Sequence, residues 1–141
     1  MGNHDQDRYL RPNEQKVMFF LIGALYLTDP KIKSHFCQYL DDHSVDWAIY
    51  KLIKQKNLPE WFANEMRWFD PLYSLLHELR PKISLAVTYG LVRIDGDRYR
   101  YHLDEVSEPL LRRLLMDEKL DYAEVKKFAD DLSQEILNPT K

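Results

Sequence analysis

Basic side chains gather in one stretch of the sequence, residues 80–103, where they could bind phosphate groups or an acidic protein surface. Five residues of this stretch are Lys or Arg and two are Asp, which gives a net charge of +3, whereas the whole chain carries −3. Positive charge concentrated in one segment is typical of nucleic-acid contact. The candidate contact residues are Arg80, Lys82, Arg93, Arg98, Arg100 and His102.

Other features of the sequence make DNA only one of two interpretations of this basic stretch. Residues 104–141 carry a net charge of −4 and would repel phosphate unless they point away from it. The outward positions expected on a helix over residues 82–89 are few and mostly neutral, whereas readers of the major groove usually offer Arg, Asn or Gln. The charges therefore permit DNA binding without requiring it.

In residues 98–103, basic and aromatic side chains alternate, as expected for a strand with one basic and one aromatic face. The basic face could contact a phosphate backbone or an acidic protein. Equally, its charges could protect a free sheet edge from aggregation.

The sequence lacks the residue patterns of common catalytic and metal sites. Its four glycines are scattered and form no phosphate-binding loop, and its five histidines are not paired at zinc-ligand spacing. Asp41, Asp42 and His43 are expected to cap helices, and the single cysteine, Cys37, is expected to be a small buried thiol. We therefore expect a protein that is not an enzyme and that uses no cofactor and no metal.

Two tryptophans, Trp61 and Trp68, stand in a short aromatic segment. Packing between the N-terminal helices and the rest of the domain is the favoured interpretation. The alternative is that they anchor a protein partner, because Trp is enriched at the energetic centres of interfaces.

Apolar spacing predicts several helices ahead of the basic stretch. Residues 17–27 are apolar on nearly all sides, which is typical of a central helix, and Asn13 is its expected N-cap. This run is about half the length needed to span a bilayer. No signal peptide is expected, and a lone cysteine fits a reducing cytosol, so a cytoplasmic protein is expected. Further helices are expected over residues 31–40 and, capped by Ser44, over residues 45–53.

The basic stretch itself predicts a helix over residues 70–80, a break at Pro81, and a short helix over 82–89 that ends on Gly90. A β-hairpin follows, with a type I′ turn at Asp95-Gly96. Helix, helix and hairpin in this order are typical of a winged helix-turn-helix. Two more helices are expected after caps at Ser107 and Asp121.

The predicted fold is therefore mainly α with a small β-hairpin, a winged helix-turn-helix core with extra N- and C-terminal helices. Residues 1–12 are expected to be a flexible N-terminal segment, residues 13–137 a single winged-helix-like domain, and residues 138–141 a tail.

This layout, with Phe69-Asp70-Pro71-Leu72-Tyr73, a helix, and Gly90-Leu91-Val92 before a short wing, resembles small winged-helix partner proteins of bacterial ATPases. In particular it resembles the middle-component subunits of three-component ABC ATPase systems, the Lamassu-type antiphage group. The resemblance implies a non-enzymatic adaptor that acts beside an SMC-like ATPase. No functional residue of that family maps onto a position of this chain.

Two functions are therefore expected. The first is an accessory subunit of a multiprotein complex, with a large ATPase or a second copy of the chain as its partner. The alternative is a DNA-binding winged-helix transcriptional regulator. Neither expectation includes a membrane or a small-molecule substrate.

Overall fold

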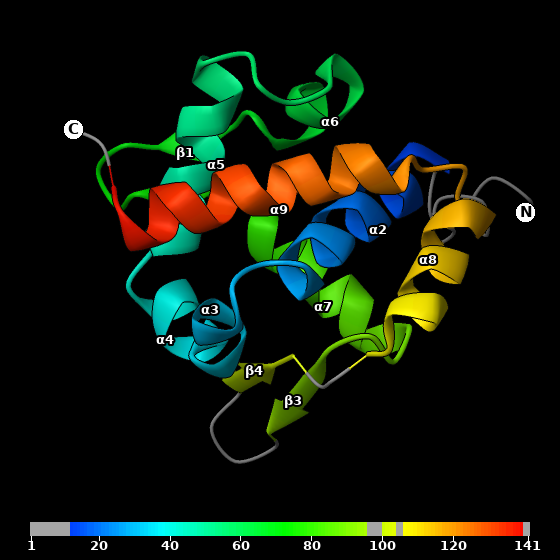
Figure 1. Cartoon of the computed structure of the whole chain (residues 1–141). Coiled ribbons are helices and arrows are strands. Elements are labelled where there is room, and N and C mark those ends of the chain that lie inside the picture. The colour runs from blue at the N-terminus through cyan, green and yellow to red at the C-terminus, as the bar shows by residue number, and fades with distance from the viewer. Residues whose placement is uncertain (1–11, 96–99, 104–105, 140–141) are drawn as a thin grey trace, which may run out of the picture.

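A computed structural model describes residues 12–95, 100–103 and 106–139 of the chain (Figure 1). The described part is mainly helical with two small antiparallel strand pairs, which confirms the predicted mainly-α class. The elements in chain order are α2 (Pro12–Tyr26), α3 (Pro30–Ser34), α4 (Phe36–Asp41), α5 (Ser44–Lys54), α6 (Glu60–Met66), β1 (Phe69–Asp70), β2 (Leu75–Leu76), α7 (Leu79–Thr88), β3 (Arg93–Asp95), β4 (Arg100–His102), α8 (Glu108–Asp117) and α9 (Tyr122–Leu137).

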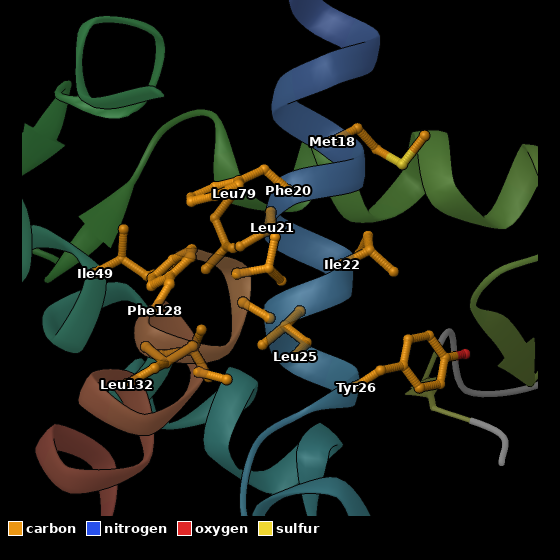
Figure 2. Close-up of a cluster of buried hydrophobic side chains, with 14 of the residues drawn as sticks. Met18, Phe20, Leu21, Ile22, Leu25, Tyr26, Ile49, Leu79, Phe128 and Leu132 are labelled. Atoms are coloured by element: carbon orange, nitrogen blue, oxygen red, sulfur yellow. The ribbon is translucent and has the colours of Figure 1, made fainter. Parts of the chain in front are cut away.

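Helix α2 is the centre of the molecule, as its apolar sequence predicts. Residues 17–26 are all buried, and the helix packs against α6, α7, α8 and α9. Figure 2 shows side chains leaving α2 on more than one side, and one group of them meets Ile49, Leu79 and Phe128. The helix already includes Pro12, so the predicted N-cap at Asn13 is wrong.

Helices α8 and α9 complete the core around α2 and begin at the caps that the sequence predicts. Ser107 accepts a hydrogen bond from the backbone N–H of Leu110, and Asp121 accepts one from that of Ala123. The ring of Phe128 on α9 stacks on Phe20 of α2, with centroids 5.2 Å apart. Burial of large aromatic rings in such contacts is a major source of stability in a domain of this size.

The predicted helix over residues 70–80 is wrong, because a small β-hairpin occupies most of this segment. Strands β1 and β2 pair antiparallel, with Phe69 opposite Leu76. The chain reverses between them where Asp70 Oδ1 accepts a hydrogen bond from the N–H of Leu72 and Ser74 takes a φ of 52°. The leucines whose spacing suggested a helix therefore lie in a turn (Leu72), in β2 (Leu75 and Leu76) and at the start of α7 (Leu79).

The predicted break at Pro81 and the separate helix over 82–89 are also wrong. Helix α7 runs through Pro81, which is its third residue. The N–H groups of the first turn have no partner within a helix, so proline is tolerated there. The predicted end is confirmed: Gly90 has a φ of 76° and donates its N–H to the carbonyl of Val87.

The hairpin of β3 and β4 follows α7, as predicted, but with a different turn. Asp95 pairs with Arg100 inside the sheet, so the type I′ turn placed at Asp95-Gly96 is wrong. The connection falls on residues 96–99, including Arg98, which lie outside the described residues. The element directly before α7 is the β1–β2 hairpin and not the helix that the predicted order of helix, helix and hairpin requires.

Two smaller predictions in the N-terminal half differ from the structure. The single helix expected over residues 31–40 is divided at His35 into α3 and α4. His43, with a φ of 65°, precedes α5, and Ser44 is the first residue of that helix and not its N-cap. The boundary predicted for the N-terminal segment involves residues 1–11, which lie outside the described residues.

Candidate binding surfaces

Arg80 binds a buried carboxylate with its guanidinium, while about 30% of its side chain remains exposed. Its Nη1 lies 2.8 Å from Oδ2 of Asp46, a side chain with no exposed surface, and its Nη2 donates to the carbonyl of Leu40 at 2.7 Å. A guanidinium that is hydrogen-bonded to a buried carboxylate compensates the buried negative charge and so supports the folded structure. The charge of Arg80, a predicted contact residue, is therefore already paired with Asp46.

The prediction that Lys82 faces outward on the helix over 82–89 is wrong. Only 2% of it is exposed, and its Nζ lies 3.0 Å from Glu78 and 3.8 Å from Glu14. Its ammonium group is thus buried and already paired with two partly exposed carboxylates, which leaves little charge to offer a phosphate. Two of the six predicted contact residues are thus structural.

The β3–β4 hairpin brings three other predicted residues onto one face. Arg93 pairs with His102 across the sheet, and Asp95 pairs with Arg100, so all four side chains share a face. Asp95 makes an ion pair with Arg93 at 3.2 Å, and its Oδ2 lies 2.9 Å from Nε2 of His102. One carboxylate therefore offsets part of the positive charge of this face.

Tyr101 occupies the opposite face of the hairpin, as the predicted alternation of basic and aromatic residues requires. Its hydroxyl lies 2.9 Å from Oγ of Ser84 on α7, and β4 packs against α4. The strand is therefore held between two helices.

The basic face of the hairpin closes one side of a pocket. The volume of this pocket is about 390 Å³, and its other side is formed by residues 33–38 and Asp41 of the α3–α4 region. The titratable side chains that line it are Lys33, His35, Cys37, Asp41, Arg93, Arg100 and His102. In the described residues, the hairpin's basic side chains thus face a partly enclosed space.

Cys37 lies in this pocket and is partly exposed, so the expectation of a buried thiol is wrong. Burial of the sulfur is nevertheless the main cause that raises its pKa, and Asp41 raises the pKa further through its charge and a hydrogen bond at 3.6 Å. Arg100 and a backbone hydrogen bond with Tyr101 act in the opposite direction. The raised pKa keeps the thiol protonated at neutral pH, which makes it a weak nucleophile.

A second group of side chains, of which the sequence predicts only Trp68 as a partner anchor, consists of exposed and half-buried apolar residues on α5 and around the β1–β2 hairpin. We call it the aromatic patch; its members are Trp47, Tyr50, Trp68, Phe69, Leu72 and Tyr73. Trp68 is 64% exposed and Leu72 79%. The rings of Tyr50 and Phe69 stack with centroids 4.0 Å apart, and Trp47 lies 5.8 Å from Phe69. Large patches of exposed apolar side chains often mark sites where a protein binds a partner.

Two cations border the aromatic patch. Lys54 Nζ lies 5.5 Å from the ring centroid of Tyr50, and the guanidinium of Arg67 lies 5.6 Å from that of Trp68. Within the described part of the chain, neither has a carboxylate partner. The patch is therefore apolar with a positive border.

The two predicted tryptophans have different environments. Trp61 is half-buried, with its ring 5.2 Å from that of Phe20 and Lys16 Nζ lying 4.5 Å from its centroid. Trp68 belongs to the exposed patch. The packing interpretation therefore fits Trp61, and the anchor interpretation fits Trp68.

Comparison with known proteins gives no further guide to these surfaces. The chain matches no family model, no curated protein and no solved structure. Among the residues that the structure describes, no helix has the length and apolar character to cross a membrane. The same residues bring together no group of three His, Cys, Asp or Glu side chains suited to a metal ion.

Proposed function

We propose that this chain is a non-enzymatic accessory subunit that binds another protein of a multiprotein complex through the aromatic patch. The observation that carries the proposal is the exposure of Trp47, Trp68, Leu72 and Tyr73 on α5 and the β1–β2 hairpin. Leaving such large apolar side chains in water forgoes the free energy of their burial. Trp and Tyr are also the residues that most often dominate binding energy at protein interfaces.

The border of the patch indicates the chemistry of the partner. Lys54 and Arg67 lie over aromatic rings of the patch and have no carboxylate partner in the described residues. A partner segment with apolar side chains flanked by Asp or Glu would cover the rings and neutralise these cations. Complementary charges at an interface border mainly favour the correct partner and speed its association.

The resemblance stated for the sequence makes an SMC-like ATPase of a bacterial antiphage system the first partner to test. In that setting the chain would act in the cytoplasm, and α7 with the β3–β4 hairpin would form its winged-helix-like part. The β1–β2 hairpin would then stand where a helix-turn-helix has its first helix. The aromatic patch lies partly on this hairpin. The segment that differs from a helix-turn-helix is therefore also part of the proposed binding surface.

Purification of the tagged chain from the organism that makes it, at near-native expression, tests the function. Mass spectrometry of the recovered complex identifies the partner, and light scattering measures the stoichiometry. Stoichiometric recovery of a large ATPase supports the accessory-subunit function. Recovery of the chain alone, or with nuclease-sensitive DNA, counts against this function. Recovery of a complex of two copies would identify the partner as a second copy of the chain and not an ATPase.

A DNA-binding regulator is the second candidate, favoured by the exposed Arg93 and Arg100 on the β3–β4 hairpin. Against this function, Lys82 is buried, and the charge of Arg80 is already paired with that of Asp46. Steep loss of duplex affinity with rising salt distinguishes the regulator from the accessory subunit, because each phosphate contact releases a counterion.

A further inference from the structure

The pocket between the α3–α4 region and the β3–β4 hairpin collects positive charge from segments far apart in the sequence. Lys33 comes from α3, whereas Arg93 and Arg100 come from the two strands of the hairpin, and Asp41 is the one carboxylate of the lining. This pocket shares no residue with the aromatic patch, so its role is independent of the proposed protein partner.

Two of these cations are available to a ligand. Arg93 is already paired with Asp95 at 3.2 Å. Lys33 and Arg100 have no carboxylate partner within the described ranges of the chain, and Asp41 accepts a hydrogen bond from the thiol of Cys37. Cations in a concave site with low-dielectric walls attract anions more strongly than the same charges on an open surface.

Two histidines add hydrogen-bonding groups to the lining. His102 Nε2 lies 2.9 Å from Oδ2 of Asp95, and His35 Nδ1 lies 3.1 Å from both the carbonyl of Lys31 and Oγ of Ser34. Each ring therefore has one nitrogen held by the protein. The other nitrogen of each ring has no described partner and can serve a ligand.

We propose that this pocket binds the phosphate group of a small molecule of nucleotide size. A tetrahedral dianion offers acceptors on several sides, which suits cations that converge from two walls. The volume of about 390 Å³ lies within the range of about 300–1,000 Å³ that is usual for small-molecule sites.

The orientation of the hairpin favours a compact anion over a DNA duplex. Arg93 and Arg100 line the same pocket as Lys33, His35 and other residues of the α3–α4 region, so the strands of the hairpin stand opposite a second wall. The backbone of a duplex needs cations on an open surface, whereas these cations face a second wall. A duplex is therefore the outcome that would contradict this proposal.

A titration of the full chain, labelled with ¹⁵N and kept in phosphate-free buffer, tests the site. The probes are inorganic phosphate, adenosine 5′-monophosphate, adenosine, and sodium chloride at matched ionic strength. We expect saturable shifts of the ring signals of His35 and His102 with the two phosphate compounds only. Lys33→Gln and Arg100→Gln should each weaken binding about tenfold or more, because each removes a charge-assisted hydrogen bond.

Lys126→Gln is the matched control, because Lys126 is an exposed lysine on α9 that pairs with Asp130 and does not line the pocket. It should leave phosphate affinity unchanged. Bound phosphate should also slow alkylation of Cys37 in the unmodified chain, since the thiol lines the same space.

Three results would each overturn the proposal. The first is the absence of saturable shifts at millimolar phosphate. The second is equal phosphate affinity in the Lys33, Arg100 and Lys126 variants. The third is a duplex that binds through Arg100 and is not displaced by adenosine 5′-monophosphate, which would assign these side chains to a nucleic acid.

Discussion

The guanidinium of Arg80 holds the carboxylate of Asp46 through two hydrogen bonds, 2.8 Å from Nη1 to Oδ2 and 3.1 Å from Nη2 to Oδ1. Asp46 has no exposed surface, and its Oδ2 also accepts the backbone N–H of Leu76 at 2.8 Å. One carboxylate therefore joins α5, β2 and α7. The same pair ties the β1–β2 hairpin, and with it part of the aromatic patch, to the core.

Replacing Asp46 with Ala should lower the free energy of unfolding by about 3 kcal/mol or more. The change leaves the guanidinium of Arg80 without its carboxylate and the N–H of Leu76 without an acceptor inside the protein. Urea denaturation measures the loss. The matched control is Asp130→Ala, which breaks an exposed pair with Lys126 and should cost less than about 1 kcal/mol. Similar losses in the two variants would show that the buried pair contributes no more than a surface one.

The two predicted tryptophans should differ in their effect on stability. Trp61→Ala should cost about 2 kcal/mol, since this half-buried ring packs on Phe20. Trp68→Ala should change stability by less than about 0.5 kcal/mol, because the side chain is largely in solvent. Thermal denaturation of both variants checks the difference. A large loss with Trp68→Ala would mean that this tryptophan belongs to the core and cannot be a partner anchor.

Any affinity of the chain for a DNA duplex should come from the β3–β4 hairpin and its connection. The double variant Arg98→Glu and Arg100→Glu should therefore abolish it, whereas Lys82→Met should leave it unchanged, because Lys82 is buried. Fluorescence anisotropy between about 50 and 200 mM salt measures both the affinity and its salt dependence. Undiminished duplex affinity in the double variant would place the contact elsewhere on the molecule.

Cys37 should react slowly with iodoacetamide at neutral pH. Only the thiolate reacts, and the raised pKa of Cys37 means that its thiolate fraction at a given pH is below that of an ordinary cysteine. The reaction rate should rise only as the pH increases toward the raised pKa. Asp41→Asn removes a negative charge that raises this pKa, so it should speed the reaction. Alkylation followed by mass spectrometry across the pH range checks both statements, and an unchanged rate in Asp41→Asn would contradict the role of Asp41.

The features that the sequence predicts correctly depend on neighbouring residues. The caps at Ser107 and Asp121 each accept a hydrogen bond from an N–H two or three residues later. Gly90 ends α7 because its own conformational freedom allows a φ of 76°. Helix α2 is central because its apolar residues cover all of its sides. Each of these signals lies within a single element, so a local pattern is enough to find it.

The features that the sequence predicts wrongly depend on contacts between residues that are far apart in the chain. The sequence makes Arg80 a candidate contact because its partner, Asp46, stands 34 residues away, beyond any local pattern. Lys82 pairs with Glu14 of α2 in the same way. Residues 70–80 have leucines at helical spacing, yet Leu72 is exposed in a turn, and strand pairing overrides that spacing.

The aromatic patch had one sequence signal that could have been used. Val45, Ala48, Ile49 and Leu52 form the apolar stripe of α5, and Trp47 stands outside it. A large aromatic residue away from the buried stripe of an amphipathic helix is exposed unless another element covers it. The apolar stripe alone does not show which elements surround Trp47, because that depends on tertiary packing.

The affinity of the purified partner for variants of the aromatic patch tests the proposed function most directly. Biolayer interferometry compares the natural chain with the double variant Trp68→Ser and Leu72→Ser, and with Met116→Ser as a matched control. Met116 on α8 is 72% exposed, similar to Trp68 and Leu72, but lies outside the patch. The double variant should weaken binding about 100-fold or more, and Met116→Ser should change it less than about twofold. Equal affinities for all three proteins would contradict the assignment of the aromatic patch as the partner-binding surface.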